Sequence, residues 1–324
     1  MLDQPGTIAP ITICGGPTSG KSTLTALLEG LPGIFALPLW HDCLSAGLCY
    51  LSAPFWRNTV HFRENITQLW HVRHVLCCHT RWLDLEIFAR QRYVPYSLSG
   101  SRLISIPFSL DVYHMEKVLA DRVASMPHYD EATVFDAAAS VLHEFLHPQE
   151  APPPRRAVSM GPVDFYRFEM LAERYPKGKA IYIDRRPAEA LASYVHREAA
   201  LSGKSFAEAG TEYFTRYGAM IQRMFKARAH AREWAGEHPE MLRIIPFNEL
   251  ILHTEPVMRA LLDWLGVPFS PLALRGTWQG NCIDAQCTGV IHDAVLDSLS
   301  ATEREFLEER IAEWDQPGQR EPYL

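Results

Sequence analysis

A glycine-rich loop near the N-terminus constrains the fold of this chain more than any other feature. Residues 15–22 read GGPTSGKS, a complete G-x-x-x-x-G-K-S/T pattern. An apolar run at 11–14 precedes the loop, and a helical pattern at 23–28 follows it. Glycines let the backbone curl so that several N–H groups face one anion, and the positive end of the next helix adds to this attraction. The loop therefore predicts a phosphate-binding site between a strand and a helix, with Lys21 as a mobile positive charge.

The composition is that of a soluble globular protein with a sizeable core. Hydrophobic residues make up 47% of the 324 residues and charged residues 21%. The net charge of -7, without any basic run, argues against a nucleic-acid-binding surface as the main function. The most apolar stretch outside the loop region, residues 43–56, is too short to span a membrane and contains Pro54. We therefore expect no membrane span and no nucleic-acid partner.

The cysteines and the start of the chain indicate the compartment. The seven cysteines follow no regular spacing, and the first residues carry no apolar signal segment. Cysteines of this kind are typical of core residues in a reducing environment. We expect a cytoplasmic protein.

Strand-like and helical patterns alternate on both sides of a long middle region. The expected strands are residues 11–14, 33–38, 180–183 and 242–247, and the expected helices are 111–126, 130–145, 164–175, 187–202, 205–234, 255–264 and the segment that starts at 300. Residues 149–156, rich in proline, are expected to form an extended connector.

This alternation predicts an α/β fold of three layers, α/β/α, with a central parallel sheet of the P-loop nucleotide-binding type. Residues 1–324 are expected to form a single domain. The stretch from about 50 to 150, which reads as mostly helical from 58 to 147, is expected to be an insertion over the ligand-binding edge of the sheet.

Three stretches together resemble the sulfotransferase family. Residues 181–194 (IYIDRRPAEALASY) are similar to the family's 3′-phosphate-binding segment, in which a strand ends in an arginine and a serine follows eight positions later; Arg185 and Ser193 hold these positions. Residues 18–24 resemble the family's loop for the 5′-phosphosulfate group, and residues 246–268 resemble a later segment of the family. The order and the separation of the three stretches also match.

The resemblance implies a donor, a reaction and a set of residues. The donor would be 3′-phosphoadenosine 5′-phosphosulfate (PAPS), and a sulfuryl group would pass in line to a hydroxyl or amine of a small-molecule or glycan acceptor, without a metal ion. Lys21 and Ser22 would stabilise charge on the bridging oxygen, and His41 or Asp42 would accept the acceptor's proton. The residues implied to hold the donor are Gly16, Thr18, Ser19, Gly20, Lys21, Ser22, Thr23, Arg185 and Ser193.

An ATP-dependent kinase of a small molecule is the main alternative. Lys21 stands where the sulfotransferase loop commonly has threonine or glycine, and a lysine-bearing loop is what such kinases use. Asp184, at the end of an apolar strand, would then hold Mg²⁺, and Arg185 with Arg186 would clamp phosphates. A protein that binds a nucleotide and regulates a partner without turnover is a further alternative.

A second motif in the chain spells a zinc-protease pattern. Residues 143–147 read HEFLH, which matches H-E-x-x-H, where two histidines one helical turn apart hold the metal. Pro148 follows at once and disfavours helical geometry at His147. We interpret the motif as the end of a helix.

Overall fold

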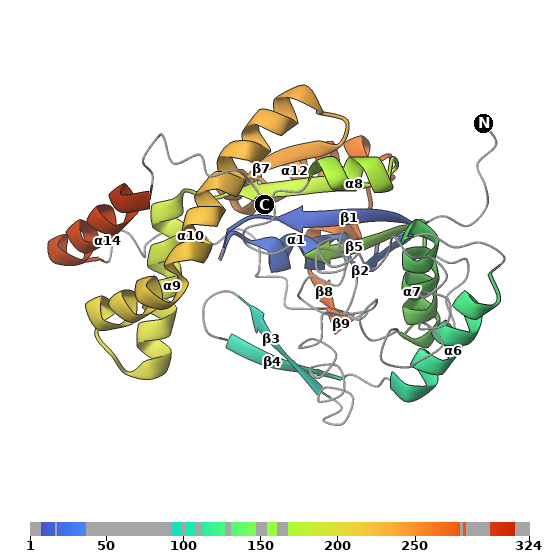
Figure 1. Ribbon diagram of the computed structural model, residues 1–324, viewed down its shortest axis with the longest axis horizontal. Helices are drawn as coiled ribbons and strands as arrows, with labels where there is room; N and C mark the ends of the chain where they lie inside the picture. Colours follow the sequence, from blue (N-terminus) through green and yellow to red (C-terminus); the bar gives the residue numbers. More distant parts are fainter. Residues whose placement is uncertain are drawn as a thin grey trace.

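The computed structural model describes residues 8–16, 18–36, 93–98, 102–107, 112–126, 131–146, 154–160, 168–278, 281–282 and 299–314. Its centre is a parallel sheet of five strands in the order β2-β5-β1-β6-β7 (Figure 1). The strands are β1 (Ala9–Cys14), β2 (Ile34–Ala36), β5 (Arg156–Met160), β6 (Lys179–Asp184) and β7 (Leu242–Pro246). Helices cover both faces, so the predicted three-layer α/β/α class is confirmed.

The two faces of the sheet differ in chemistry. On the face that we call apolar, the side chains of β1 and β6 pack against three helices, α1 (Lys21–Leu28), α11 (Phe247–Leu252) and α12 (Thr254–Leu265). The strand residues of this cluster include Ile11, Ile13, Ile181 and Ile183. Because side chains alternate along a strand, Thr12, Cys14, Tyr182 and Asp184 point to the other face, which we call polar.

A long helix lies over the polar face. α10 (Phe206–Glu237) contacts β7, and its Arg228 and Arg232 pair with Asp184 at the end of β6. The short helix α8 (Phe168–Arg174) also packs there, since Phe168 stacks on Trp234 of α10. Near the other edge of the sheet, His143 of α7 (Glu131–Leu146) contacts the ring of Phe35 in β2.

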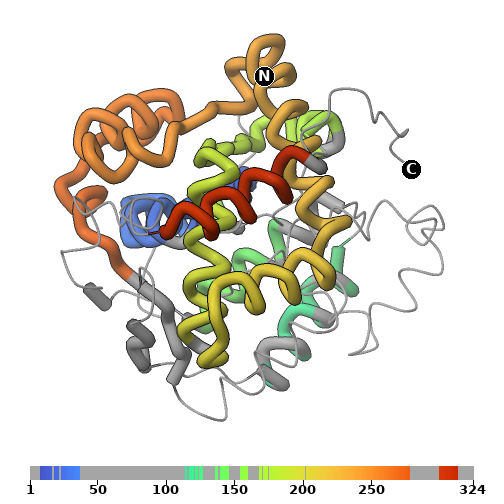
Figure 2. The backbone as a smooth tube through the Cα atoms, turned by 90° about the vertical axis from the view of Figure 1, so that its left-hand side faces the viewer, coloured from blue at the N-terminus to red at the C-terminus, as the bar shows by residue number. Residues whose placement is uncertain are grey.

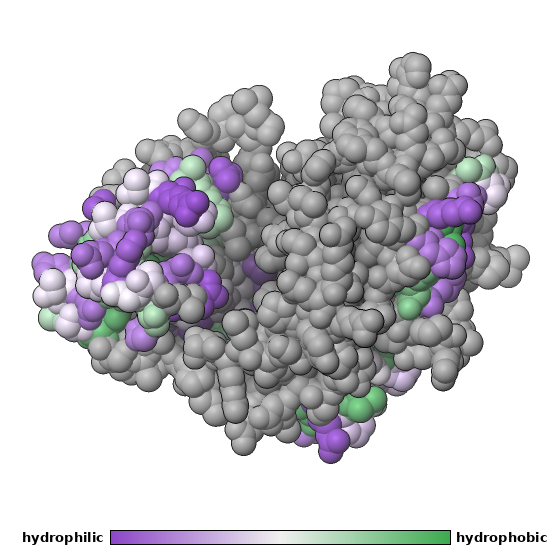
Figure 3. Space-filling model, turned by 90° about the horizontal axis from the view of Figure 1, so that it is seen from below, coloured by the Kyte–Doolittle hydropathy of each residue, from purple (hydrophilic) through white to green (hydrophobic). Residues whose placement is uncertain are grey.

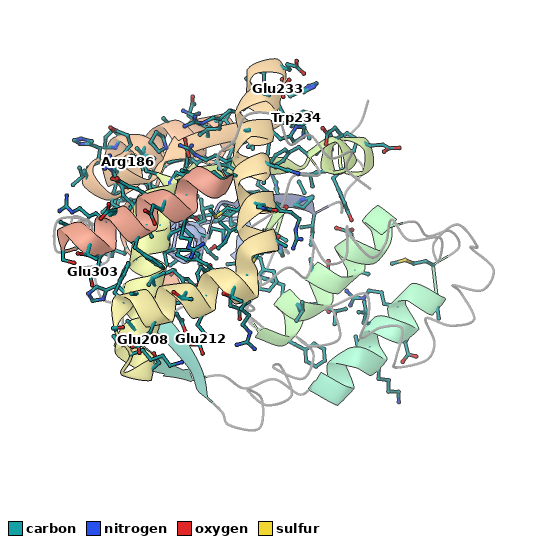
Figure 4. The ribbon with its side chains drawn as sticks, turned by 60° about the vertical axis from the view of Figure 1, so that its left-hand side comes forward. Arg186, Glu208, Glu212, Glu233, Trp234 and Glu303 are labelled. Atoms are coloured by element: carbon teal, nitrogen blue, oxygen red, sulfur yellow. The ribbon has the colours of Figure 1, made fainter. Side chains whose placement is uncertain are left out.

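Three helices form a second apolar cluster at one end of the molecule. α9 (Pro187–Ser202), α10 and α14 (Ala301–Trp314) share this cluster, and α14 lies across the other two (Figure 2). Capping boxes begin two of these helices, Ser205 with Glu208 in α10 and Ser300 with Glu303 in α14. The two glutamates are labelled in Figure 4. Hydrophilic side chains cover much of the described surface at this end (Figure 3).

The remaining elements occupy the middle region and the stretch after α12. α6 (Val112–Ala124) lies beside α7, at the end of the molecule away from α14 (Figure 1). β3 (Tyr93–Leu98) pairs antiparallel with β4 (Arg102–Pro107), and β8 (Thr277–Trp278) pairs with β9 (Asn281–Cys282). The 3-10 helix η3 (Pro271–Leu274) precedes β8. No helix among these described elements combines the length and apolarity that a membrane span needs.

The structure contains two elements that the sequence analysis did not predict. Within the stretch that reads as mostly helical, residues 93–107 contain the β3–β4 hairpin, whose strands flank a Ser-Gly pair that favours a turn. The strand β5 at Arg156–Met160 was also not predicted, and it lies between β1 and β2 and pairs with both. A run of five residues is too short for its alternation to stand out, and neighbours on both sides stabilise it as a strand.

Candidate functional site

The glycine loop follows β1 and turns directly into α1. Gly15 has a φ of 141°, and a Cβ placed there would lie 2.7 Å from the backbone oxygen of Ile183. Gly20, the N-cap of α1, has a φ of 91°, and a Cβ there would lie 2.9 Å from the ring of Phe247. Both positions therefore need glycine, for conformation and for space. The loop thus fits closely between the ends of β6 and β7, with the positive end of α1 facing it.

Two hydrogen bonds tie the loop to the segment that follows β6. The hydroxyl of Thr18 donates to the carbonyl oxygen of Ala190 in α9 at 2.8 Å. Arg185 Nη1 donates to the carbonyl oxygen of Thr18 at 2.6 Å, and the Arg185 guanidinium lies over the ring of Phe247, 4.4 Å from its centroid. Arg185 therefore joins the three stretches on which the resemblance rests: the loop, the end of β6 and the start of α11.

Lys21 turns back over the loop from the first turn of α1. Its Nζ donates to the carbonyl oxygens of Gly15 at 2.5 Å and Gly16 at 3.1 Å. The positive charge is therefore held at the rim of the loop, close to the backbone that would cradle an anion. Thr23 also lies in the first turn of α1.

A small pocket lies beside the loop, with a cavity volume of about 10 Å³, which is room for about one water molecule. Its described lining residues are Gly16, Ser19, Tyr182, Ile183, Arg185, Pro187, Ala190, Met224, Phe225 and Arg228. Of the predicted donor-binding residues, the pocket therefore brings together Gly16, Ser19 and Arg185. Lys21 and Ser193 do not line it, although Ser193 lies in α9 one helical turn after Ala190.

Ser19 contributes a buried hydroxyl to this pocket. Its side chain is 2% exposed, and its Oγ has no hydrogen-bond partner within the described part of the chain. A buried polar atom without a partner costs free energy, so a ligand atom at this position would be stabilised. The hydroxyl therefore fits a polar ligand in the pocket.

Asp184 does not have the surroundings that the kinase alternative requires. Its two carboxylate oxygens accept hydrogen bonds from Arg228 Nε and Arg232 Nη2, each at 2.6 Å.

Tyr182, two residues before Asp184 on β6, is buried. Burial, with smaller contributions from Cys14 and Asp184, raises the pKa of the Tyr182 phenol well above its ordinary value. The phenol thus stays protonated at neutral pH.

The zinc-protease pattern is not assembled as a metal site in the part of it that the structure describes. His143 is buried against Phe35, and Glu144 forms a two-bond ion pair with Arg122, at 2.9 and 2.8 Å. α7 ends at Leu146, so His147 lies outside the described residues. Across the described ranges as a whole, no group of three His, Cys, Asp or Glu side chains is placed to hold a metal ion.

The remaining predicted residues lie either in α1 or outside the described part of the chain. His41 and Asp42, the candidate bases, lie outside the described residues, and Ser22 is the second residue of α1. Sequence reasoning missed Arg228, which reaches the pocket from α10. The sequence did contain a signal for this ion pair. It has an aspartate at the end of a buried strand and two arginines spaced four residues apart on a long helix, which places them on one helix face.

Comparison with known proteins identifies the class. The sequence profile of the Sulfotransferase family matches residues 10–271. This match covers most of the chain, so the protein belongs to the sulfotransferase family. Membership supports sulfuryl transfer and does not support the kinase alternative. No curated protein matches the chain significantly in sequence.

Several solved structures are similar to the chain. One is a sulfotransferase domain from the curacin biosynthetic pathway, with 16% identity, a TM-score of 0.43 and coverage of 97% of this chain and 99% of that one. A second is the sulfotransferase domain of the Synechococcus PCC 7002 olefin synthase, with 13% identity, a TM-score of 0.48 and coverage of 97% and 98%. A third is the sulfotransferase STF9 from Mycobacterium avium, with 15% identity, a TM-score of 0.41 and coverage of 97% and 78%.

Proposed function

We propose that the protein transfers a sulfuryl group from PAPS to a hydroxyl or amine of a small-molecule or glycan acceptor. The glycine loop binds the 5′-phosphosulfate, and Arg185 with Ser193 binds the 3′-phosphate. In this proposal residues 1–324 act as a single cytoplasmic domain, and no metal ion takes part.

One observation carries the proposal: Arg185 is hydrogen-bonded to the loop itself, through the carbonyl oxygen of Thr18. A nucleotide with phosphate groups at both ends of its ribose needs cationic contacts at two nearby places. The loop, with Lys21 at its rim, provides the first place, and Arg185 at the end of β6 provides the second. Family membership supports the same donor class.

The proposed reaction assigns a charge-stabilising role to Lys21 and Ser22. The acceptor oxygen or nitrogen attacks sulfur while the bond from sulfur to the bridging phosphate oxygen breaks, and 3′-phosphoadenosine 5′-phosphate (PAP) leaves. Negative charge develops on that oxygen, where the Lys21 ammonium and the Ser22 hydroxyl can donate hydrogen bonds. Lys21 Nζ would exchange its bonds to the Gly15 and Gly16 carbonyls for this one, which its flexible side chain permits.

The acceptor's proton must leave during the same step. We assign its removal to His41 or Asp42, which follow the stretch after β2 in the sequence. We assign acceptor binding to the insertion at about 50–150, which precedes β5 in the sequence. An insertion there would lie over the edge of the sheet at which ligands bind in folds of this type.

Thermal unfolding with two competing ligands tests the proposal. A ligand that binds only the folded state stabilises it by about 2.7 kcal/mol at 100 times its dissociation constant. We expect PAP to raise Tm strongly and ATP with Mg²⁺ to raise it little at equal concentration. A larger shift with ATP and Mg²⁺ would contradict the proposed donor.

A further inference from the structure

Two arginines of α10 share one carboxylate, but only one of them reaches the pocket. Arg228 Nε and Arg232 Nη2 each donate to Asp184 at 2.6 Å. The side chain of Arg228 is 24% exposed and lines the pocket, whereas that of Arg232 is 53% exposed and does not line it. The pair therefore contains a pocket residue and a matched residue outside the pocket.

The position of Arg228 leaves part of its guanidinium for a second acceptor. Its bond to Asp184 uses Nε, while a guanidinium carries five N–H donors in a planar fork. Two parallel bonds from such a fork match the oxygens of a phosphate group. Asp184 thus holds the Arg228 guanidinium through Nε, and this bond does not use the two terminal amino groups of Arg228.

The charge around the pocket favours a dianion. Two guanidinium groups, of Arg185 and Arg228, are among the described residues that line the pocket, and no carboxylate is among them. The charge of Asp184, which lies outside this lining, is shared between Arg228 and Arg232. The Ser19 hydroxyl, which has no hydrogen-bond partner among the described residues, and the protonated phenol of Tyr182 are further polar groups that line the pocket. A phosphate monoester, which carries close to two negative charges at neutral pH, suits this set.

We propose that Arg228, positioned by Asp184, binds the 3′-phosphate of the donor together with Arg185 and makes the site selective for nucleotides that carry this group. The inference rests on the proposed function, because it concerns the same nucleotide. It adds a contact from α10 to the contacts proposed above for the 3′-phosphate. Arg228 and Arg185 both line the pocket, whereas Ser193 does not.

Calorimetric titration with PAP and with adenosine 5′-monophosphate (AMP) tests the inference, since the two ligands differ only in the 3′-phosphate. Arg228→Met should weaken PAP binding by about 10- to 100-fold, the usual effect of losing a charge-assisted bond, and should change AMP binding by less than about 2-fold. Arg228→Lys should fall between, because it keeps the charge and loses the fork. Arg232→Met, the matched control, should leave both affinities unchanged.

The outcomes separate this inference from the proposed function. Equal losses for PAP and AMP in Arg228→Met, or the same PAP loss in Arg232→Met, would overturn the role of Arg228 while the donor stands. A native protein that binds PAP no better than ATP with Mg²⁺ would overturn both. If Arg228→Met does not fold, Arg228→Lys decides, and an unchanged PAP-to-AMP ratio in that variant would contradict the inference.

The positioning role of Asp184 has its own readout. Asp184→Asn should lower the PAP-to-AMP affinity ratio, and Asp184→Glu should restore part of it. A merely structural role would lower the thermal stability of the Asn variant and leave this ratio unchanged, which would contradict a positioning role.

Discussion

The apolar and polar faces of the central sheet perform different tasks with side chains from the same strands. On the apolar face, Ile181 and Ile183 of β6 are buried with α1 and α12. On the polar face, Tyr182 lines the pocket and Asp184 pairs with two arginines of α10. Strand alternation makes this division possible, since neighbouring residues point to opposite faces.

The difference indicates which substitutions affect folding and which affect binding. The apolar face holds the glycine loop in place through α1, because this helix follows the loop directly and packs on that face. The polar face supplies hydrogen-bonding and charged groups to the pocket. Changes on the apolar face should therefore lower the free energy of unfolding, whereas changes on the polar face should alter nucleotide affinity at nearly constant stability.

The largest expected effect concerns the apolar face. Ile13 in β1 is fully buried, and Ile13→Ala should lower the free energy of unfolding by about 2–5 kcal/mol through lost transfer energy and a cavity. Ile13→Val, the matched control, should cost only about 0.5–1.5 kcal/mol. Denaturant unfolding measures both. Similar costs for the two variants would show that the apolar face does not support the loop as described.

The next effect concerns the loop between the two faces. Lys21→Ala should lower kcat for sulfuryl transfer from PAPS by about 10²–10³, the usual result of losing a preorganised charge stabiliser. Steady-state release of PAP measures this rate, and thermal unfolding of the same variant checks that the loop remains folded. An unchanged rate would remove Lys21 from the mechanism.

Two glycines with positive φ provide a comparison of strain with crowding. Gly33→Ala should cost about 1 kcal/mol of stability, because its φ is 76° but no atom of the described residues lies within 4 Å of an added Cβ. Gly15→Ala should cost about 2–4 kcal/mol, since its Cβ would also press on the Ile183 carbonyl. Chemical denaturation compares them, and equal costs would contradict the close fit of the loop.

The smallest effect concerns the helix over the polar face. Ser205→Ala removes the N-cap of α10 and should cost about 1 kcal/mol. Hydrogen bonds from Ser205 hold the pKa of Glu208 below its ordinary value of 4.5. A lowered folded-state pKa adds stability above the unfolded-state value, and this stability is lost as pH falls through the folded-state value.

The cost of Ser205→Ala should therefore be smaller at pH 3 than at pH 7, as measured by thermal unfolding at both. A cost independent of pH would mean that Glu208 takes no part in the cap.

Local signals predicted much of this fold, and contacts between distant segments account for what they missed. Pro187 at the start of α9, the Ser205–Glu208 box before α10 and Gly266 after α12 each mark a helix end in the sequence, and the structure places the ends there. β5 carries no such mark, since its strand character comes from pairing with β1 and β2.

The site follows the same rule. The loop and Arg185 each lie in a local motif, and the structure brings them into contact. Arg228 lies in the middle of a long helix, and its four-residue spacing from Arg232 does not by itself say which strand end it faces. The ion pair with Asp184 of β6 establishes its place beside the pocket.

The central claim, that one nucleotide is held by both the glycine loop and Arg185, is tested most directly by the affinity of Arg185→Ala for PAP and for ADP. ADP carries no 3′-phosphate. We predict a loss of about 1.5–3 kcal/mol for PAP, a charge-assisted contact, and a much smaller loss for ADP. Equal losses for the two nucleotides in calorimetric titration would contradict the claim.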